Sequence, residues 1–159
     1  MTRLYGKLCY IIIFRVFLIN FKNTLFFILF IFMIDRFDYI FVGLGNHGPK
    51  YQKTRHNIGW LALYEFVLRN DKDFNPSEGL QAYQAKVKVG DKNILCLLPT
   101  TYMNNSGETV RAAIKKYKVP TKNIIILVDE YNFDLGKIHL KIGGSAGGHN
   151  GLKSLLFHL

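Results

Sequence analysis

The sequence contains few cysteines, few prolines and few acidic side chains. Its 159 residues include two cysteines and four prolines, and 11 acidic side chains stand against 21 basic ones, a formal net charge of +10. Cys9 and Cys96 match neither a disulfide framework nor a zinc-ligand spacing, so we expect two reduced thiols. The shortage of acidic groups indicates a polyanionic partner, either nucleic acid or an acidic membrane face.

An uninterrupted apolar run of membrane-spanning length is also lacking. Residues 1–34 are strongly apolar, but Arg15 and Lys22 interrupt them, and the longest clean run, Leu25–Ile34, is far shorter than the roughly 20 residues of a span. No small-residue cleavage site follows, so a signal peptide fits poorly. We favour a mis-called start, with Met33 as the true initiator, over a membrane anchor, which stays open as the alternative.

Residues 35–159 are long enough for one domain with its own core. Short apolar runs predict buried strands at 39–44, 94–98 and 124–128, and alternating runs predict further strands at 82–89 and 137–142. Near-helical spacing predicts helices at 57–69, at 106–118 and from about residue 152, with loops at 71–79 and 143–151. Such a succession predicts a single α/β domain, with a mixed β-sheet sandwiched between helices.

Two glycine-rich loops imitate nucleotide-binding motifs. Residues 43–48 match G-x-G-x-x-G, but the next helix is predicted to begin only near Asn57, and the acidic residue about 20 positions on is Glu65, inside that helix. A Rossmann-type NAD-dependent oxidoreductase is therefore a less favoured alternative. The loop at 143–151 has Leu152 where a P-loop requires glycine before the lysine.

Polar side chains collect where the predicted strands end. Asn46 follows the first strand, His56 precedes the first helix and Asp129 ends a later strand, while residues 102–104 and 149–150 lie in two further loops. Helix capping or turn formation would explain each of them alone. Together they favour a functional site, because the crevice beyond the carboxyl ends of the strands is the usual binding place in open α/β sheets.

The residue types in these loops favour hydrolysis by an activated water molecule. A histidine and an aspartate occur without a candidate activated serine or cysteine, and an imidazole can take a proton near neutral pH while a carboxylate holds its tautomer. Amide side chains can stabilise an oxyanion. No pair of histidines has the i, i+4 spacing with glutamate that a zinc hydrolase needs, so a zinc hydrolase has little support.

Three stretches carry a resemblance to a known family. GLGNHGPKYQKTRHNIG at 43–59, PTTYMNNSG at 99–107 and GGSAGGHNGLK at 143–153 are similar to the signature segments of bacterial-type peptidyl-tRNA hydrolases, and they occur in the family's order. The resemblance implies a peptidyl-tRNA hydrolase-like fold and hydrolysis of the ester bond that joins peptide to tRNA. It also implies a cytoplasmic monomer that uses no metal or organic cofactor.

The resemblance further implies a role for each matching residue. His56 would be the base that activates water, Asp129 would stabilise its basic form, and Asn46 would help to distinguish blocked peptidyl-tRNA from free aminoacyl-tRNA. The residues implied to contact the 3′ end of the tRNA and the ester are Tyr51, Tyr102, Asn104 and Asn150, and those implied to line the same cleft are Met103 and His149.

The sequence departs from the family pattern in places. His47 stands where proline is usual, Val128 stands where histidine is common, and residues 132–134 differ from the usual apolar-rich stretch. Family members continue past Leu156 with a strand and a helix. We therefore expect residues 35–159 to be a catalytic domain with its C-terminal part missing and with impaired activity. A tRNA-binding relic without activity is the alternative reading.

Overall fold

The computed structural model describes residues 35–51, 54–130 and 136–159. The prediction of a mis-called start or an anchor at residues 1–34 lies outside the described residues. Arg36–Leu159 forms one compact unit. Within the described part of the chain, no helix is both long enough and apolar enough to cross a membrane.

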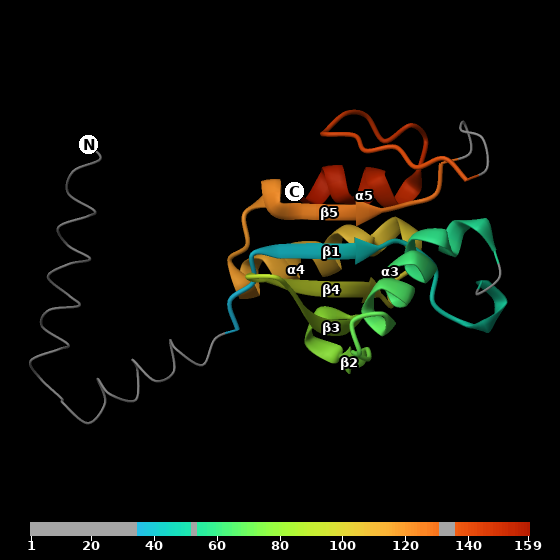
Figure 1. Cartoon of the computed structure of the whole chain (residues 1–159). Coiled ribbons are helices and arrows are strands. Elements are labelled where there is room, and N and C mark those ends of the chain that lie inside the picture. Colours follow the sequence, from blue (N-terminus) through green and yellow to red (C-terminus); the bar gives the residue numbers. More distant parts are fainter. Residues whose placement is uncertain (1–34, 52–53, 131–135) are drawn as a thin grey trace, which may run out of the picture. The chain divides into compact units, whose positions relative to one another are not determined.

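A mixed sheet of five strands forms the centre of the described residues, in the order β2-β3-β4-β1-β5 (Figure 1). The central strand β1 runs parallel to β4 and β5, whereas β3 is antiparallel to both β4 and β2. The carboxyl ends of β1, β4 and β5 therefore share one edge of the sheet. The strand bounds are Tyr39–Gly43 for β1, Asn75–Ser77 for β2, Ala82–Val89 for β3, Lys92–Pro99 for β4 and Ile124–Leu127 for β5.

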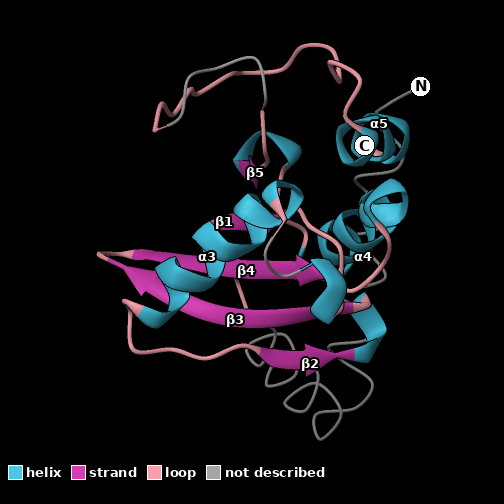
Figure 2. Cartoon of the chain, turned by 90° about the vertical axis from the view of Figure 1, so that its right-hand side faces the viewer, coloured by secondary structure: helices cyan, strands magenta, loops and turns pink. Residues whose placement is uncertain are grey.

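Helices cover both faces of this sheet, as the two views in Figures 1 and 2 show. Helix α3 (Ile58–Leu68) lies on one face, and helices α4 (Ser106–Tyr117) and α5 (Asn150–His158) lie on the other. Short 3-10 turns at Arg55–Asn57 and Met103–Asn105 precede α3 and α4. The predicted α/β domain, with a mixed sheet between helices, is confirmed.

Alternating side chains of the strands supply two apolar cores. In β1, Ile40 and Val42 pack with α4 and α5, whereas Phe41 packs toward α3. The same alternation in β4 sends Leu95 and Leu97 to the first core and its neighbours to the second. The apolar runs predicted at 39–44 and 94–98 therefore have both faces covered, which is typical of strands with helices on each side, whereas β5 at the edge of the sheet is only partly buried.

Three predictions of secondary structure need correction. Residues 137–142 form no strand, and their apolar side chains Ile138, Leu140 and Ile142 are almost fully exposed, because β5 is the last strand of the sheet among the described residues. The predicted loop at 71–79 contains the short edge strand β2, in which Pro76 is tolerated. Helix α5 begins at Asn150 rather than near Leu152.

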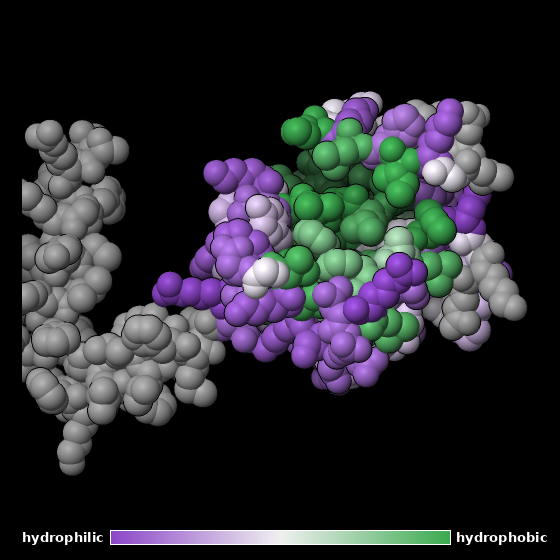
Figure 3. Space-filling view, in the orientation of Figure 1, coloured by the Kyte–Doolittle hydropathy of each residue, from purple (hydrophilic) through white to green (hydrophobic). Residues whose placement is uncertain are grey.

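Apolar side chains also gather on the face of the molecule that carries α3 (Figure 3). Ile58 and Leu61 of α3 and Ile125 of β5 are among the large apolar residues exposed there. The described residues therefore leave uncovered part of the apolar surface that the strand and helix patterns provide.

Candidate active site

The first element of the site is a tight junction between β1, α3 and β5. The backbone N–H of Leu44 donates to the carbonyl oxygen of Leu127 at 2.9 Å, and the N–H of Trp60 donates to the carbonyl oxygen of Leu44 at 3.1 Å. At Gly59, a Cβ atom would overlap the carbonyl oxygen of Leu127. Glycine thus lets the start of α3 lie directly against the end of β5, which brings His56 beside Asp129.

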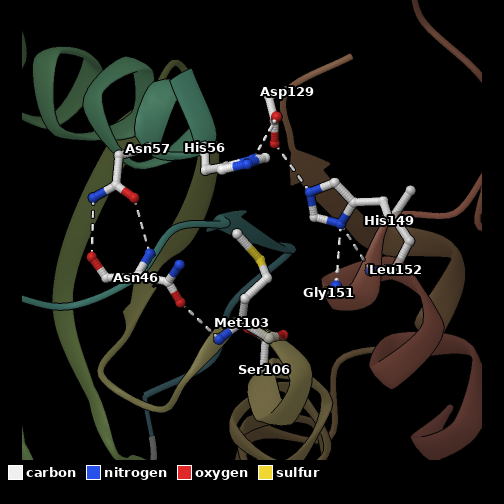
Figure 4. A network of polar contacts seen from close by, with 9 residues as sticks. All are labelled: Asn46, His56, Asn57, Met103, Ser106, Asp129, His149, Gly151 and Leu152. Atoms are coloured by element: carbon white, nitrogen blue, oxygen red, sulfur yellow. Dashed lines mark hydrogen bonds and ion pairs between the residues drawn. The ribbon is translucent and has the colours of Figure 1, made fainter. Parts of the chain in front are cut away.

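His56 and Asp129 are in direct contact, although 73 residues separate them in sequence (Figure 4). The His56 Nδ1 atom lies 2.9 Å from Asp129 Oδ2, and the side chains are 55% and 10% exposed. Because a carboxylate only accepts hydrogen bonds, Nδ1 carries the proton, and Nε2 keeps a free lone pair. The exposed imidazole therefore presents a base to the outside of the site.

A second contact fixes the loop after β1. The backbone N–H of Asn46 donates to Asn57 Oδ1 at 2.9 Å, and Asn57 Nδ2 donates to the carbonyl oxygen of Asn46 at 3.0 Å. The buried Asn57 amide thus pairs with the Asn46 backbone as a peptide group pairs across a sheet. From the sequence, Asn57 was assigned only to the start of the predicted helix, because nothing in the local pattern shows which backbone groups its side chain reaches.

The side chain of Asn46 is oriented by the loop after β4. The backbone N–H of Met103 donates to Asn46 Oδ1 at 3.0 Å. Since that N–H can only donate, the amide oxygen faces Met103, and the Nδ2 amino group is turned the other way. Figure 4 shows this nitrogen on the side of the site that faces the Met103 side chain and His56. Among the described residues, it has no hydrogen-bond partner, so it is a ready donor.

His149 reaches the same aspartate from the start of α5. Its Nε2 atom lies 3.0 Å from Asp129 Oδ1, and its Nδ1 atom accepts hydrogen bonds from the backbone N–H groups of Gly151 at 3.1 Å and Leu152 at 3.3 Å. A Cβ on Gly151 would lie 2.7 Å from Met103 Sδ. Glycine therefore allows α5 to approach the Met103 loop closely.

The structure thus brings five of the predicted site residues together in a polar network of two neighbouring hydrogen-bonded groups, with His56, Asp129 and His149 in one and Asn46 and Met103 in the other. Asn104 and Asn150 follow Met103 and His149 in the chain, and both are exposed. Tyr102 is exposed and Tyr51 is half-buried, in the 3-10 turn Pro49–Tyr51. Among the described residues, no hydrogen bond or ion pair joins the side chains of these four residues to the network, so their roles stay predictions.

The unusual His47 belongs to an aromatic cluster. Its ring stacks on Trp60 with centroids 6.3 Å apart and meets Tyr83 edge-on at 5.7 Å. These three residues help to line a pocket of about 410 Å³ that adjoins the polar network through Asn46 and Asn57. Of the other departures from the family pattern, Val128 packs against the α4–α5 core, and residues 132–134 lie outside the described residues.

The described cysteine takes no part in this site. Cys96 lies buried in β4, and burial raises the pKa of its thiol from 9.0 to about 12. A thiol held in its protonated form is a poor nucleophile. Among residues 35–51, 54–130 and 136–159, no group of three or more histidine, cysteine, aspartate or glutamate residues is placed to hold a metal ion.

The fold and the site define an α/β protein with a histidine–carboxylate pair beside an amide donor, an arrangement typical of hydrolases that activate water with a general base. A sequence profile of the family described as peptidyl-tRNA hydrolase matches residues 40–159. The chain therefore belongs to the peptidyl-tRNA hydrolase family, as the three sequence motifs predicted.

Individual relatives agree with this assignment. The peptidyl-tRNA hydrolase of Prochlorococcus marinus (strain MIT 9313) is 43% identical over 120 residues, which are 76% of this chain and 58% of that protein. The peptidyl-tRNA hydrolase of Leuconostoc mesenteroides is 44% identical over 116 residues, or 73% of this chain and 61% of that protein. The chain thus spans about three fifths of the length of these relatives.

Solved structures lead to the same family. The crystal structure of peptidyl-tRNA hydrolase from Acinetobacter baumannii has a TM-score of 0.74 and 32% sequence identity, over 78% of this chain and 64% of that chain. The oxidoreductase alternative gains no support, because α3 begins at Ile58, well beyond the glycine loop at 43–48. In the dinucleotide-binding motif, the helix would start at that loop.

Proposed function

We propose that the site hydrolyses the ester bond between peptide and tRNA in peptidyl-tRNA, by general-base activation of water. The contact of His56 Nδ1 with Asp129 Oδ2 carries this proposal, because it leaves Nε2 of an exposed imidazole free to accept a proton. Family membership and the net charge of +10 support a tRNA substrate.

The reaction needs a proton acceptor and a donor for the developing oxyanion. His56 Nε2 takes a proton from water as the oxygen attacks the ester carbonyl, and Asp129 stabilises the imidazolium that forms. The Nδ2 group of Asn46 donates to the carbonyl oxygen as it becomes negative. The imidazolium then returns the proton to the ribose oxygen as the carbon–oxygen bond breaks, which regenerates the base.

The remaining predicted residues would hold the substrate. Asn46 would also help to distinguish blocked from free aminoacyl groups, and the exposed Tyr102, Asn104 and Asn150 would contact the 3′ end of the tRNA together with Tyr51. Met103 would line the cleft. We further propose that the protein works in the cytoplasm as a monomer, without a metal or an organic cofactor.

The test uses two forms of one aminoacyl-tRNA, with the amino group acetylated or free. We expect the chain to release the acetylated amino acid and to leave the free form largely intact. Release from neither form would contradict the proposal. Binding of tRNA that weakens with added salt, without any release, would identify a tRNA-binding relic instead.

A further inference from the structure

Asp129 contacts two histidines, and the proposed reaction uses only one of them. His56 lies against Oδ2 and His149 against Oδ1, at 2.9 and 3.0 Å. His149 is only 15% exposed, whereas His56 is 55% exposed. The covered histidine is poorly placed to meet a substrate, so its contact with Asp129 calls for a different role.

The hydrogen bonds around His149 determine its tautomer. Its Nδ1 atom faces the backbone N–H groups of Gly151 and Leu152, which can only donate, so Nδ1 must be an unprotonated acceptor. The ring proton is then on Nε2, where it is donated to Asp129 Oδ1. Both nitrogens are therefore occupied, and neither is available to bind substrate or transfer a proton.

We propose that His149 is a positioning residue that holds the carboxylate of Asp129 for His56. A carboxylate bonded through one oxygen can turn about its Cβ–Cγ bond, whereas bonds to both oxygens keep Oδ2 directed at His56. The start of α5 fixes the His149 ring, because its first backbone N–H groups hold the imidazole in the orientation that makes Nε2 a donor. The inference rests on the proposed hydrolysis, in which His56 is the base.

Two substitutions separate this role from simple helix capping. His149→Asn keeps a short side-chain acceptor for the amides of α5 but cannot reach Asp129. His149→Gln places an amide donor at the distance of Nε2 but loses the cap. We expect H149N to melt near the wild-type temperature with kcat about tenfold lower and KM within twofold. We expect H149Q to melt about 4 °C lower with kcat within about threefold of wild type.

Opposite results would overturn the proposal. If H149N retains kcat while H149Q loses it, His149 is only a helix cap. If both variants raise KM and leave kcat unchanged, His149 contacts the substrate rather than positioning Asp129.

Nitrogen NMR of the imidazole rings tests the tautomer without any turnover. We expect a protonated Nε2 and a bare Nδ1 at His149, and a protonated Nδ1 and a bare Nε2 at His56. A protonated Nδ1 at His149 would disprove the positioning role even in an active protein. If the wild-type chain releases no blocked amino acid but has the expected tautomers, the proposed function fails and the geometry of the positioning contact stands.

Discussion

The starts of α3 and α5 each bring a histidine to Asp129, yet the two regions are built differently. At α3, the helix is held by backbone contacts with Leu44 and Leu127, and the histidine is left exposed with one nitrogen free. At α5, the histidine is itself the cap of the helix, and both of its nitrogens are bonded. The residue type is the same in both places.

Hydrogen-bond partners, rather than residue type or proximity to Asp129, therefore decide which histidine keeps a ring nitrogen free to accept a proton. A histidine can act as a base only through a nitrogen whose lone pair is not already engaged in a hydrogen bond and that the substrate can reach. His56 meets both conditions, and His149 meets neither. Substitutions at both helix starts and in the strands and loops around them can test this difference.

Removal of the proposed base should have the largest effect. We expect His56→Ala to lower kcat for acetylated aminoacyl-tRNA by about 10³-fold, because water loses its proton acceptor. The melting temperature should change little, since the side chain is largely exposed. His158→Ala, at the end of α5, is the matched histidine control and should keep its activity. An H56A variant as active as the control would show that the base lies elsewhere.

The two helix starts should also differ in their tolerance of a methyl group. We expect Gly59→Ala to reduce the free energy of unfolding by about 3 kcal/mol, because its Cβ would meet the backbone of Leu127. Gly151→Ala meets the ends of the flexible Met103 and Leu44 side chains and should cost about 1 kcal/mol. Urea denaturation measures both. Equal losses of unfolding free energy would mean that the start of α3 packs no more tightly than the start of α5.

The Nδ2 donor of Asn46 can be removed while the hydrogen bond from the Met103 N–H to the Asn46 side chain is kept. Asn46→Asp keeps an oxygen for the Met103 N–H but replaces the free amino group with a second oxygen. We expect kcat to fall by about 10²-fold, the usual effect of losing one oxyanion donor. Single-turnover hydrolysis measures this step directly, and Asn105→Asp in the neighbouring turn is the control. Unchanged kcat in N46D would exclude Asn46 as the oxyanion donor.

The two hydrogen bonds between the Asn57 side chain and the Asn46 backbone should contribute to stability. Asn57→Ala removes two hydrogen bonds and leaves the N–H and the carbonyl of Asn46 without these partners. We expect a loss of about 2 kcal/mol in the free energy of unfolding, because unpaired polar groups in a covered site are costly. Chemical denaturation measures it. A variant as stable as wild type would mean that water replaces the two hydrogen bonds of Asn57.

The smallest expected effect is a loss of stability at alkaline pH. Burial raises the pKa of Cys96 from 9.0 to about 12, so the unfolded chain loses the thiol proton in this range while the folded chain keeps it. Between these pH values, stability should fall by about 1 kcal/mol per pH unit. Denaturation at pH 9, 10 and 11 checks the slope, and Cys96→Ala should reduce it. An equal slope in C96A would assign it to other groups.

The sequence predicted most strands of the sheet, but it missed the edge strand β2 and predicted a strand at 137–142 that does not form. The run 94–98 is buried on both faces and the run 124–128 is only partly buried, yet local apolarity marks both as strands. The segment 137–142 has an equally clear alternation but forms no strand, because a strand also needs a neighbour with which to pair. The short strand β2 was missed for the converse reason: pairing with β3 outweighs the weak preference of residues 75–77.

The family, the α/β class and the residues that gather at the strand ends could be predicted from the sequence alone, because these depend on local pattern and on motifs read in order. The tertiary structure was needed to show which histidine keeps a free ring nitrogen and which way the Asn46 amide faces. Those properties depend on hydrogen bonds between residues far apart in the chain, such as Met103 to Asn46 and His149 to Asp129. No local pattern contains the geometry of such contacts.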